Sequence, residues 1–141
     1  MDIRFVLLPL FFQVLLTFGL GVTLFMSRSS ALSRREVRWQ DIALGEPGWP
    51  VGATKRANVF RNQFEVPVLF YVLMILLIIT RHADILMLVL AWVFVLTRAV
   101  HAWIFLTSNY VPHRGLTFGV GVLVLLIMWV FFMVRILVGL P

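Results

Sequence analysis

Residues 64–106 read FEVPVLFYVLMILLIITRHADILMLVLAWVFVLTRAVHAWIFL, and this stretch decides the fold. It consists of two apolar runs, Phe64–Thr80 and Ile85–Leu106, which are joined by the short segment Arg81–Asp84. Each run approaches or exceeds the roughly 20 residues that a helix needs to span the hydrocarbon of a bilayer. Because the connection has room only for a tight turn, it predicts that the two spanning helices are antiparallel neighbours.

Two further apolar runs, Phe5–Met26 and Leu116–Leu140, flank this pair. We therefore predict an all-α membrane protein, a four-transmembrane-helix bundle. It forms one domain over residues 1–141, with spans at about 5–26, 58–80, 85–106 and 116–140. A β-barrel would need alternating segments of about ten residues, which these continuous runs do not show. The first run is longer than a signal-peptide core of about 7–15 residues, and no clear cleavage site follows it, so we predict a retained span.

The composition limits the chemistry. The chain is 62% hydrophobic and has no cysteine, which excludes disulfides, thiolate metal sites and a catalytic cysteine; no metal site is predicted. The net charge is +6, but the basic residues lie mostly between the apolar runs. There they are explained by membrane topology and by contact with membrane lipid headgroups. Nucleic-acid binding is not expected.

The distribution of basic residues predicts the orientation in the membrane. The loop 27–57 contains Arg28, Arg34, Arg35, Arg38, Lys55 and Arg56, and Arg114 lies in the third loop. The opposite side has only Arg4, Arg81 and Arg135. Since cytoplasmic loops carry the excess of Lys and Arg, we predict that loop 27–57 is cytoplasmic and that both termini are on the non-cytoplasmic side.

A few polar residues lie within or beside the spans, where burial is costly. On the second helix, Asn58, Arg61, Asn62 and Glu65 recur at offsets of three and four, which places them on one flank. Pro67 follows Glu65 after one residue, and it predicts a kink beside Glu65.

The third helix has a matching polar face at a similar depth. Arg98 and His101 are three residues apart, and counting inward from the loops puts Arg98 level with Glu65. We therefore predict a buried Glu65–Arg98 ion pair, with the third loop returning Tyr110, His113 and Arg114 to the mouth of the same pocket. Taken one by one, these residues have structural explanations: Glu65 and Arg98 join helices, Asn62 and His101 are core polar groups with satisfied hydrogen bonds, and the loop arginines contact lipid headgroups. Gln13 is predicted to form an interhelical hydrogen bond. The whole set gathered at one membrane boundary favours a site for an anionic ligand.

Two segments resemble a known family. The sequence RNQFEVPVLFY at Arg61–Tyr71 resembles the second-helix signature of the MAPEG family, the membrane-associated proteins in eicosanoid and glutathione metabolism. The sequence RAVHAWIFLTSNYVPHRG at Arg98–Gly115 resembles the family's third-helix segment, with an arginine, a histidine three residues later and a loop arginine before the fourth helix. With the four-span layout and the long first loop, the resemblance covers essentially the whole chain.

The resemblance implies a homotrimer that binds glutathione at each subunit interface near the cytoplasmic face. By position, Arg61, Asn62, Glu65 and His101 would contact glutathione, Arg98 would pair with Glu65, and Arg114 would stabilise the thiolate as the catalytic residue. Arg28 would reach in from a neighbouring subunit. The compact length agrees with a bacterial-type member in the inner membrane. The chain departs from the pattern at three aromatic positions: Phe105 and Phe118 replace tyrosines, and Tyr110 replaces an arginine.

These observations leave three hypotheses for function. The leading one is a glutathione-dependent transferase or peroxidase-like enzyme that acts on lipophilic electrophiles from the bilayer. The alternative is a non-catalytic membrane subunit of the same fold, whose polar cluster binds a lipid or another anionic ligand. A channel or transporter is less favoured, because the polar residues gather at one end of the bundle and do not line a path across it.

Overall fold

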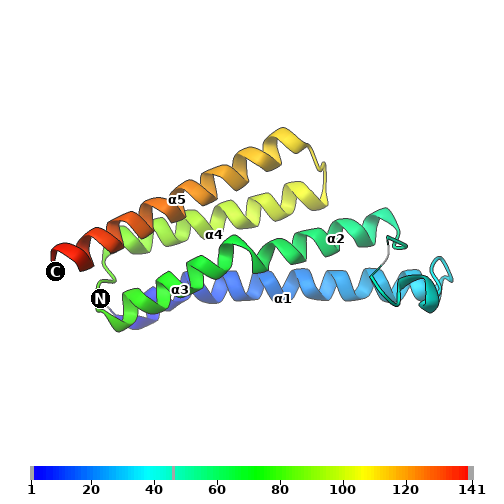
Figure 1. Ribbon diagram of the computed structural model, residues 1–141, viewed down its shortest axis with the longest axis horizontal. Helices are drawn as coiled ribbons and strands as arrows, with labels where there is room; N and C mark the ends of the chain where they lie inside the picture. The colour runs from blue at the N-terminus through cyan, green and yellow to red at the C-terminus, as the bar shows by residue number, and fades with distance from the viewer. Residues whose placement is uncertain (1, 46, 140–141) are drawn as a thin grey trace.

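The computed structural model describes residues 2–45 and 47–139, and within these residues it is helical without strands. The elements are α1 (Ile3–Ser33), η1 (Trp39–Ile42), α2 (Val51–Arg61), η2 (Asn62–Phe64), α3 (Val66–Ile79), α4 (Ile85–Leu106) and α5 (Val111–Val138). The long helices lie side by side in an elongated bundle (Figure 1). We call the end where both termini lie the terminus end. The opposite end, where α1 leads to α2 and α4 leads to α5, is the loop end.

Four helical segments are long and apolar enough to cross a membrane. They are Ile3–Ser33, Val51–Ile79, Ile85–Leu106 and Val111–Val138. Large apolar side chains on their outer faces are exposed, such as Phe18 at 70% and Phe25 at 72%. So much exposed apolar surface suits lipid, not water. The predicted all-α fold of four spans is therefore confirmed, and the protein is an integral multi-pass membrane protein.

The second span is interrupted between α2 and α3. Asn62–Phe64 form a turn of 3₁₀-helix, and Glu65 has φ −100° and ψ −106°, which is outside the helical region. The cause is Pro67, which lacks an N–H group and clashes with the carbonyl of Gln63, four residues before it, so a regular helix cannot continue through this turn. The break thus lies two residues before the proline, at Glu65, which carries the acidic side chain.

Two buried glutamines stabilise this interruption. The Gln63 Nε2 donates to the Val59 carbonyl oxygen at 3.1 Å. The Gln13 Nε2 of α1 donates to the Gln63 Oε1 at 2.9 Å. The predicted interhelical hydrogen bond of Gln13 is confirmed, and it holds α1 against the broken turn, where a lone amide would be costly.

Close packing pairs α4 with α5 and α1 with α2. A Cβ at Gly121 would lie 2.7 Å from the Thr97 Oγ1, and a Cβ at Gly21 would lie 3.0 Å from the Phe60 ring, so both glycines allow close approach of the helices. The predicted antiparallel course of α3 and α4 is confirmed (Figure 1). Their expected backbone packing is not, because α4 packs mainly on α5 and α1. Contact between α3 and α4 is made by large side chains, including the Phe70 and Phe94 rings, whose centroids are 4.6 Å apart.

Candidate functional site

A cleft of about 420 Å³ lies between α2, α4 and the start of α5. Its volume is within the roughly 300–1,000 Å³ typical of small-molecule sites. It is lined by Asn58, Arg61, Asn62, Glu65, His101, Phe105, Val111, Arg114, Gly115 and Phe118. The last six come from the end of α4 and the beginning of α5, which meet at the loop end (Figure 1).

The cleft brings together five of the six residues predicted to bind glutathione or to act in catalysis. Arg61, Asn62, Glu65, His101 and Arg114 all line it. The sixth, Arg28, does not line the cleft of its own protomer. Its guanidinium carbon lies 4.7 Å from the centre of the Trp49 ring.

His101 links α4 to α5 at the inner wall of the cleft. Its Nδ1 is 3.0 Å from the carbonyl oxygen of Arg114. Because a carbonyl oxygen only accepts, Nδ1 must carry the hydrogen, so a neutral His101 keeps Nε2 as an acceptor. The Nε2 is buried and has no hydrogen-bond partner in the described part of the chain. The ring is thus held in place by one nitrogen, while the other has no partner within the described part of the protomer.

Arg114 is oriented by a residue that the sequence did not point to. Its Nη1 donates to the Asn109 Oδ1 at 2.6 Å, and its guanidinium carbon lies 4.2 Å from the centre of the Phe105 ring. Asn109 has φ +50°, a left-handed conformation that asparagine tolerates better than most residues. The available signal was an asparagine in the turn just before the proline that starts the next helix. Asn109 therefore positions Arg114 at the edge of the cleft.

The predicted Glu65–Arg98 ion pair is not formed. Arg98 is 0% exposed, and all three of its guanidinium nitrogens lack a hydrogen-bond partner among the described residues. Glu65 is exposed, and it acts on Arg98 only through its charge. The prediction assumed a continuous second helix, whereas the backbone breaks at Glu65 and re-aims its carboxylate.

An aromatic side chain lies next to the Arg98 guanidinium. The guanidinium carbon of Arg98 lies 5.3 Å from the centre of the Phe118 ring. A cation near an aromatic face gains about 2 kcal/mol when desolvated, which offsets only part of the cost of burying a charge. Phe118 also belongs to the cleft wall, so the buried charge is separated from the cleft by one ring.

Two other residues of the third loop do not line the cleft. Tyr110 and His113 were expected at its mouth together with Arg114, but both are exposed and pack on each other, with ring centroids 4.8 Å apart. Only Arg114 faces the cleft, because helix α5 begins at Val111 and separates neighbouring side chains by about 100° around its axis. The expectation for Tyr110 and His113 was wrong.

The remaining charges of the cleft are unpaired within the protomer. Arg61 and Glu65 form no ion pair with any described residue, although both are on the same cleft wall. The cleft therefore offers cationic groups, a carboxylate, two asparagine amides and the free His101 nitrogen. This set suits a polar ligand that carries charges of both signs.

An apolar groove of about 410 Å³ begins where the cleft ends. It runs between α3 and α5 and is lined by Val66, Leu69, Val122, Leu125, Leu126 and Trp129. Val66 follows Glu65 directly, and Val122 lies one helical turn beyond Phe118. A polar cleft near the membrane surface thus continues toward an apolar groove within the membrane.

Comparison with known proteins identifies the family. No curated protein and no solved structure matches the chain. The family model described as the MAPEG family matches residues 6–134, which include all four spans' apolar centres, the broken second span and every residue that lines the cleft. A match over this share of the 141 residues shows that the chain belongs to the MAPEG family.

Proposed function

We propose that the protein is a glutathione-dependent transferase or peroxidase-like membrane enzyme that acts on lipophilic electrophiles. Its family includes glutathione-dependent transferases and peroxidases. The observation that carries the proposal is the cleft itself, where Arg61, Glu65 and Arg114 converge without ion-pair partners in the described chain. Glutathione has two carboxylates, one ammonium group and a thiol, and these complement the cationic, acidic and amide groups of the cleft.

In the proposed reaction, Arg114 stabilises the glutathione thiolate. A nearby guanidinium favours the charged form of a thiol and so lowers its pKa. The thiolate sulfur then attacks the electrophilic carbon, a carbon–sulfur bond forms, and the leaving group departs with the bonding electron pair. For a hydroperoxide, the thiolate sulfur attacks the outer oxygen, the O–O bond breaks, and the alkoxide takes a proton and leaves as the alcohol. The thiol of a second glutathione then attacks the sulfenic acid sulfur, which gives the disulfide and releases water.

The apolar groove supports a substrate that arrives from the bilayer. Its lining between α3 and α5 is aliphatic and aromatic, and it starts beside Glu65 and Phe118. An electrophile with a long apolar part would place that part in the groove and its reactive group in the cleft. Holding the two reactants together in this way supplies part of the rate enhancement.

Thermal stability with ligands provides the first test. Detergent-purified protein is titrated with reduced glutathione, with S-hexylglutathione and with an anionic tripeptide that lacks the thiol and the γ-glutamyl link. We expect a saturable rise in Tm with the first two only, because a ligand selective for the folded state stabilises it by mass action. No shift up to about ten millimolar, well above common Michaelis constants, would overturn glutathione binding.

Turnover is tested with a chromogenic aryl halide as the electrophile and with a lipid hydroperoxide. His101→Ala and His113→Ala form a matched pair, because both histidines lie at the loop end and only His101 lines the cleft. We expect the rate to fall at least about tenfold for His101→Ala and to stay unchanged for His113→Ala. Equal rates for the two variants would show that the cleft is not the reaction site.

A second candidate function is ligand binding without chemistry. It is favoured by the aromatic wall, where Phe105 and Phe118 provide no hydroxyl group beside Arg114 or His101. Such a cleft could hold an anionic lipid or peptide without activating a thiol. Stabilisation by glutathione with no turnover of either substrate would select this candidate over the enzyme.

We also propose that the protein assembles as a homotrimer. The support is Arg28, which does not reach the cleft of its own protomer, and the large apolar surface left exposed on all four spans. In a trimer, Arg28 would contribute to the cleft of a neighbouring subunit. Light scattering of the detergent-solubilised protein measures the protomer number, and a monomer that is fully active would contradict the proposal.

The proposed orientation places the loop end in the cytoplasm of a bacterial cell, with the protein in the inner membrane. The long first loop is at the loop end, opposite the two termini (Figure 1). The cleft is lined by residues from the end of α4 and the beginning of α5, which meet at the same end. Cytoplasmic glutathione would then reach the cleft directly. A C-terminal alkaline phosphatase fusion should be active, and a C-terminal green fluorescent protein fusion should be dark; the reverse result would invert the orientation.

A further inference from the structure

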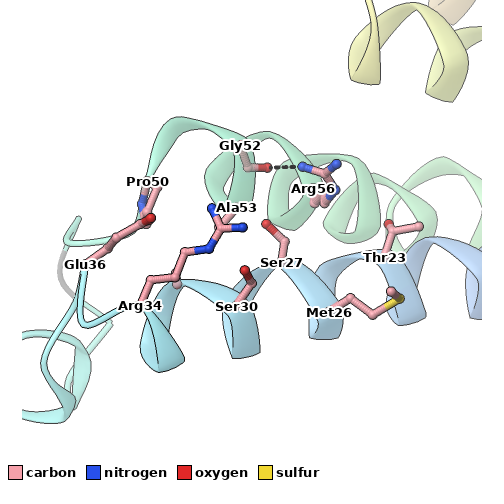
Figure 2. Close-up of a pocket in the computed structure, with 11 residues that line it drawn as sticks. Thr23, Met26, Ser27, Ser30, Arg34, Glu36, Pro50, Gly52, Ala53 and Arg56 are labelled. Atoms are coloured by element: carbon pink, nitrogen blue, oxygen red, sulfur yellow. Dashed lines mark hydrogen bonds between the residues drawn. The ribbon is translucent and has the colours of Figure 1, made fainter.

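A second cavity lies at the loop end, between the last turns of α1 and the first turns of α2. Its volume is about 400 Å³, and it shares no residue with the glutathione cleft. It is lined by Thr23, Met26, Ser27, Ser30, Ala31, Arg34, Glu36, Pro50, Gly52, Ala53 and Arg56. Figure 2 shows Ser27, Ser30 and Arg34 on the α1 side and Gly52, Ala53 and Arg56 on the α2 side. None of these residues has a role in the proposed reaction.

The two arginines of the cavity keep most of their donors free. The guanidinium of Arg34 makes no hydrogen bond or ion pair with any described residue, and the Arg56 guanidinium uses only Nη1, which donates to the Gly52 carbonyl oxygen at 3.1 Å (Figure 2). A guanidinium has five N–H donors in a fork that matches the oxygens of a phosphate. The cavity thus has two cationic forks, one on each wall.

The hydroxyl groups along α1 differ in whether they bond to their own helix. Thr17, Thr23 and Ser33 each donate a hydrogen bond to a backbone carbonyl three or four residues earlier in the helix. Ser27 and Ser30 make no such bond in the described chain, and their hydroxyls face the space between α1 and α2 (Figure 2). These two hydroxyls are therefore available to an occupant of the cavity.

The net charge of the lining residues predicts the sign of the charge on a ligand in the cavity. Arg34 and Arg56 contribute two positive charges, and Glu36 contributes one negative charge, so the net charge is +1. Glu36 forms no ion pair with any described residue. A singly charged anion that also carries hydroxyl donors would match the arginines and the carboxylate together.

The depth of the cavity in the membrane indicates that the anion is a lipid headgroup and not a soluble molecule. Helix α1 has 31 residues and is therefore about 46 Å long, whereas the hydrocarbon core of a bilayer is about 30 Å thick. The apolar run of α1 ends at Met26, so Ser27, Ser30 and Arg34 emerge into the headgroup layer. Met26 and Thr23 line the deeper side of the cavity, toward the acyl chains.

We propose that this cavity between α1 and α2 binds the phosphodiester headgroup of an anionic phospholipid with hydroxyl groups, of which phosphatidylglycerol is the probe. Arg34 and Arg56 hold the phosphate oxygens, Ser27 and Ser30 donate to them, and Glu36 accepts from the headgroup hydroxyls. The bound lipid clamps the start of α2 to α1.

The test is a Tm titration of the full-length protein with dioctanoyl phosphatidylglycerol. Dioctanoyl phosphatidylcholine has the same chains and phosphate but no net charge, and glycerol 1-phosphate is the soluble source of the same chemistry. We expect saturable stabilisation by phosphatidylglycerol at concentrations where the other two have no effect. Equal stabilisation by phosphatidylcholine would overturn headgroup selection, and equal affinity for glycerol 1-phosphate would overturn a lipid as the ligand.

Variants assign the binding to the cavity. The double variant Arg34→Gln/Arg56→Gln should weaken apparent affinity for phosphatidylglycerol at least about tenfold, because charge-assisted hydrogen bonds are lost. Arg35→Gln removes a neighbouring exposed arginine outside the cavity and should leave affinity within about twofold. Equal losses in the two variants would show that general surface charge, not the cavity, attracts the lipid.

A steric variant keeps the test decisive if the double variant is unstable. Ser30→Leu retains both arginines and fills the cavity with an apolar side chain, so affinity should again fall at least about tenfold. Undiminished affinity in Ser30→Leu, measured on protein with an unchanged elution volume, would overturn the site.

Discussion

At the terminus end of the bundle the carboxylate that begins α4 is paired with a basic side chain, whereas the charged side chains in and beside the cleft at the loop end are not paired. The Asp84 carboxylate accepts from the Met87 N–H at 2.8 Å and lies 2.6 Å from the Arg135 guanidinium. At the loop end, Arg61, Glu65 and Arg98 have no ion-pair partner among the described residues. Both ends lie near a membrane surface, so water and lipid do not explain the difference.

The comparison separates two uses of charge. A paired charge at a helix end stabilises the fold, because it satisfies free backbone groups and joins two elements. An unpaired charge in the core lowers stability, and an unpaired charge in a cleft is available to a ligand. We infer that the unpaired charges at the loop end make the ligand-free protein less stable and that they serve to bind a ligand. The following predictions test that inference, from the largest expected effect to the smallest.

Arg114→Gln should abolish most of the proposed glutathione chemistry. Loss of one charged group that stabilises a developing anion lowers the rate by roughly 100-fold or more. The measurement is the rate of conjugation to the aryl halide, with Arg81→Gln at the terminus end as the control for loss of one positive charge. A wild-type rate in Arg114→Gln would remove Arg114 from the mechanism.

Arg98→Met should raise the free energy of unfolding of the ligand-free protein by about 3 kcal/mol. Replacing a buried charged group that has no partner by an apolar side chain removes its desolvation cost. Equilibrium unfolding in mixed micelles measures the change, with Arg81→Met, on the exposed turn before α4, expected to be nearly neutral. A large loss of stability in Arg98→Met would show that the assembled protein provides a partner for the guanidinium.

Gly121→Ala tests whether close helix packing, in place of ion pairs, holds the loop end together. The new methyl group would meet the Thr97 Oγ1 at 2.7 Å, directly beside Arg98 in the sequence, so we expect a loss of about 2 kcal/mol. Gly119→Ala is the matched control on the same helix, since nothing lies within 4 Å of its Cβ position. Thermal unfolding of both variants should separate them, and equal stabilities would contradict the close α4–α5 contact.

Asp84→Ala tests the paired end and should cost about 1 kcal/mol, since the variant loses the N-cap of α4 and a partly exposed ion pair. Burial raises the pKa of Asp84, but the hydrogen bonds from the Met87 N–H and from Arg135 outweigh it, so the pKa lies below its ordinary value of 3.8.

This shift fixes the pH dependence of the Asp84 contribution. A carboxylate with a lowered folded-state pKa stabilises the protein fully above its unfolded-state pKa and loses that effect as the pH falls through the folded-state pKa. The difference in Tm between the parent and Asp84→Ala should thus be largest at about pH 6 and shrink below about pH 4. A difference that grows on acidification would be inconsistent with the pairing.

Glu65→Gln should change the stability of the ligand-free protein by less than about 0.5 kcal/mol, because the carboxylate is exposed and makes no ion pair in the described chain. Its effect should appear in the affinity for glutathione. Chemical unfolding without ligand gives the first quantity, and the Tm titration gives the second. If the free energy of unfolding of Glu65→Gln without ligand fell by several kcal/mol, the Glu65–Arg98 ion pair predicted from the sequence would be present after all.

Much of the candidate site followed from spacing along single helices. Offsets of three and four put Arg61, Asn62 and Glu65 on one flank, and the cleft contains all three. The partner of each side chain could not be predicted in the same way. Asn109 contacts Arg114 because a left-handed turn brings it back onto the next helix, and the Phe105 and Phe118 walls depend on how α4 and α5 are rotated.

The sequence by itself determined that this chain spans a membrane with four helices, since each apolar run is long enough to cross the hydrocarbon and each interruption is polar. It also determined which residues gather at the loop end. Only the tertiary structure decided that Arg98 is buried without the Glu65 carboxylate and that a second basic cavity opens between α1 and α2. The physical reason is that span length and facial spacing are local properties of one chain segment. Pairing across helices depends instead on small changes, such as the break before Pro67, which redirect a side chain by more than the reach of an ion pair.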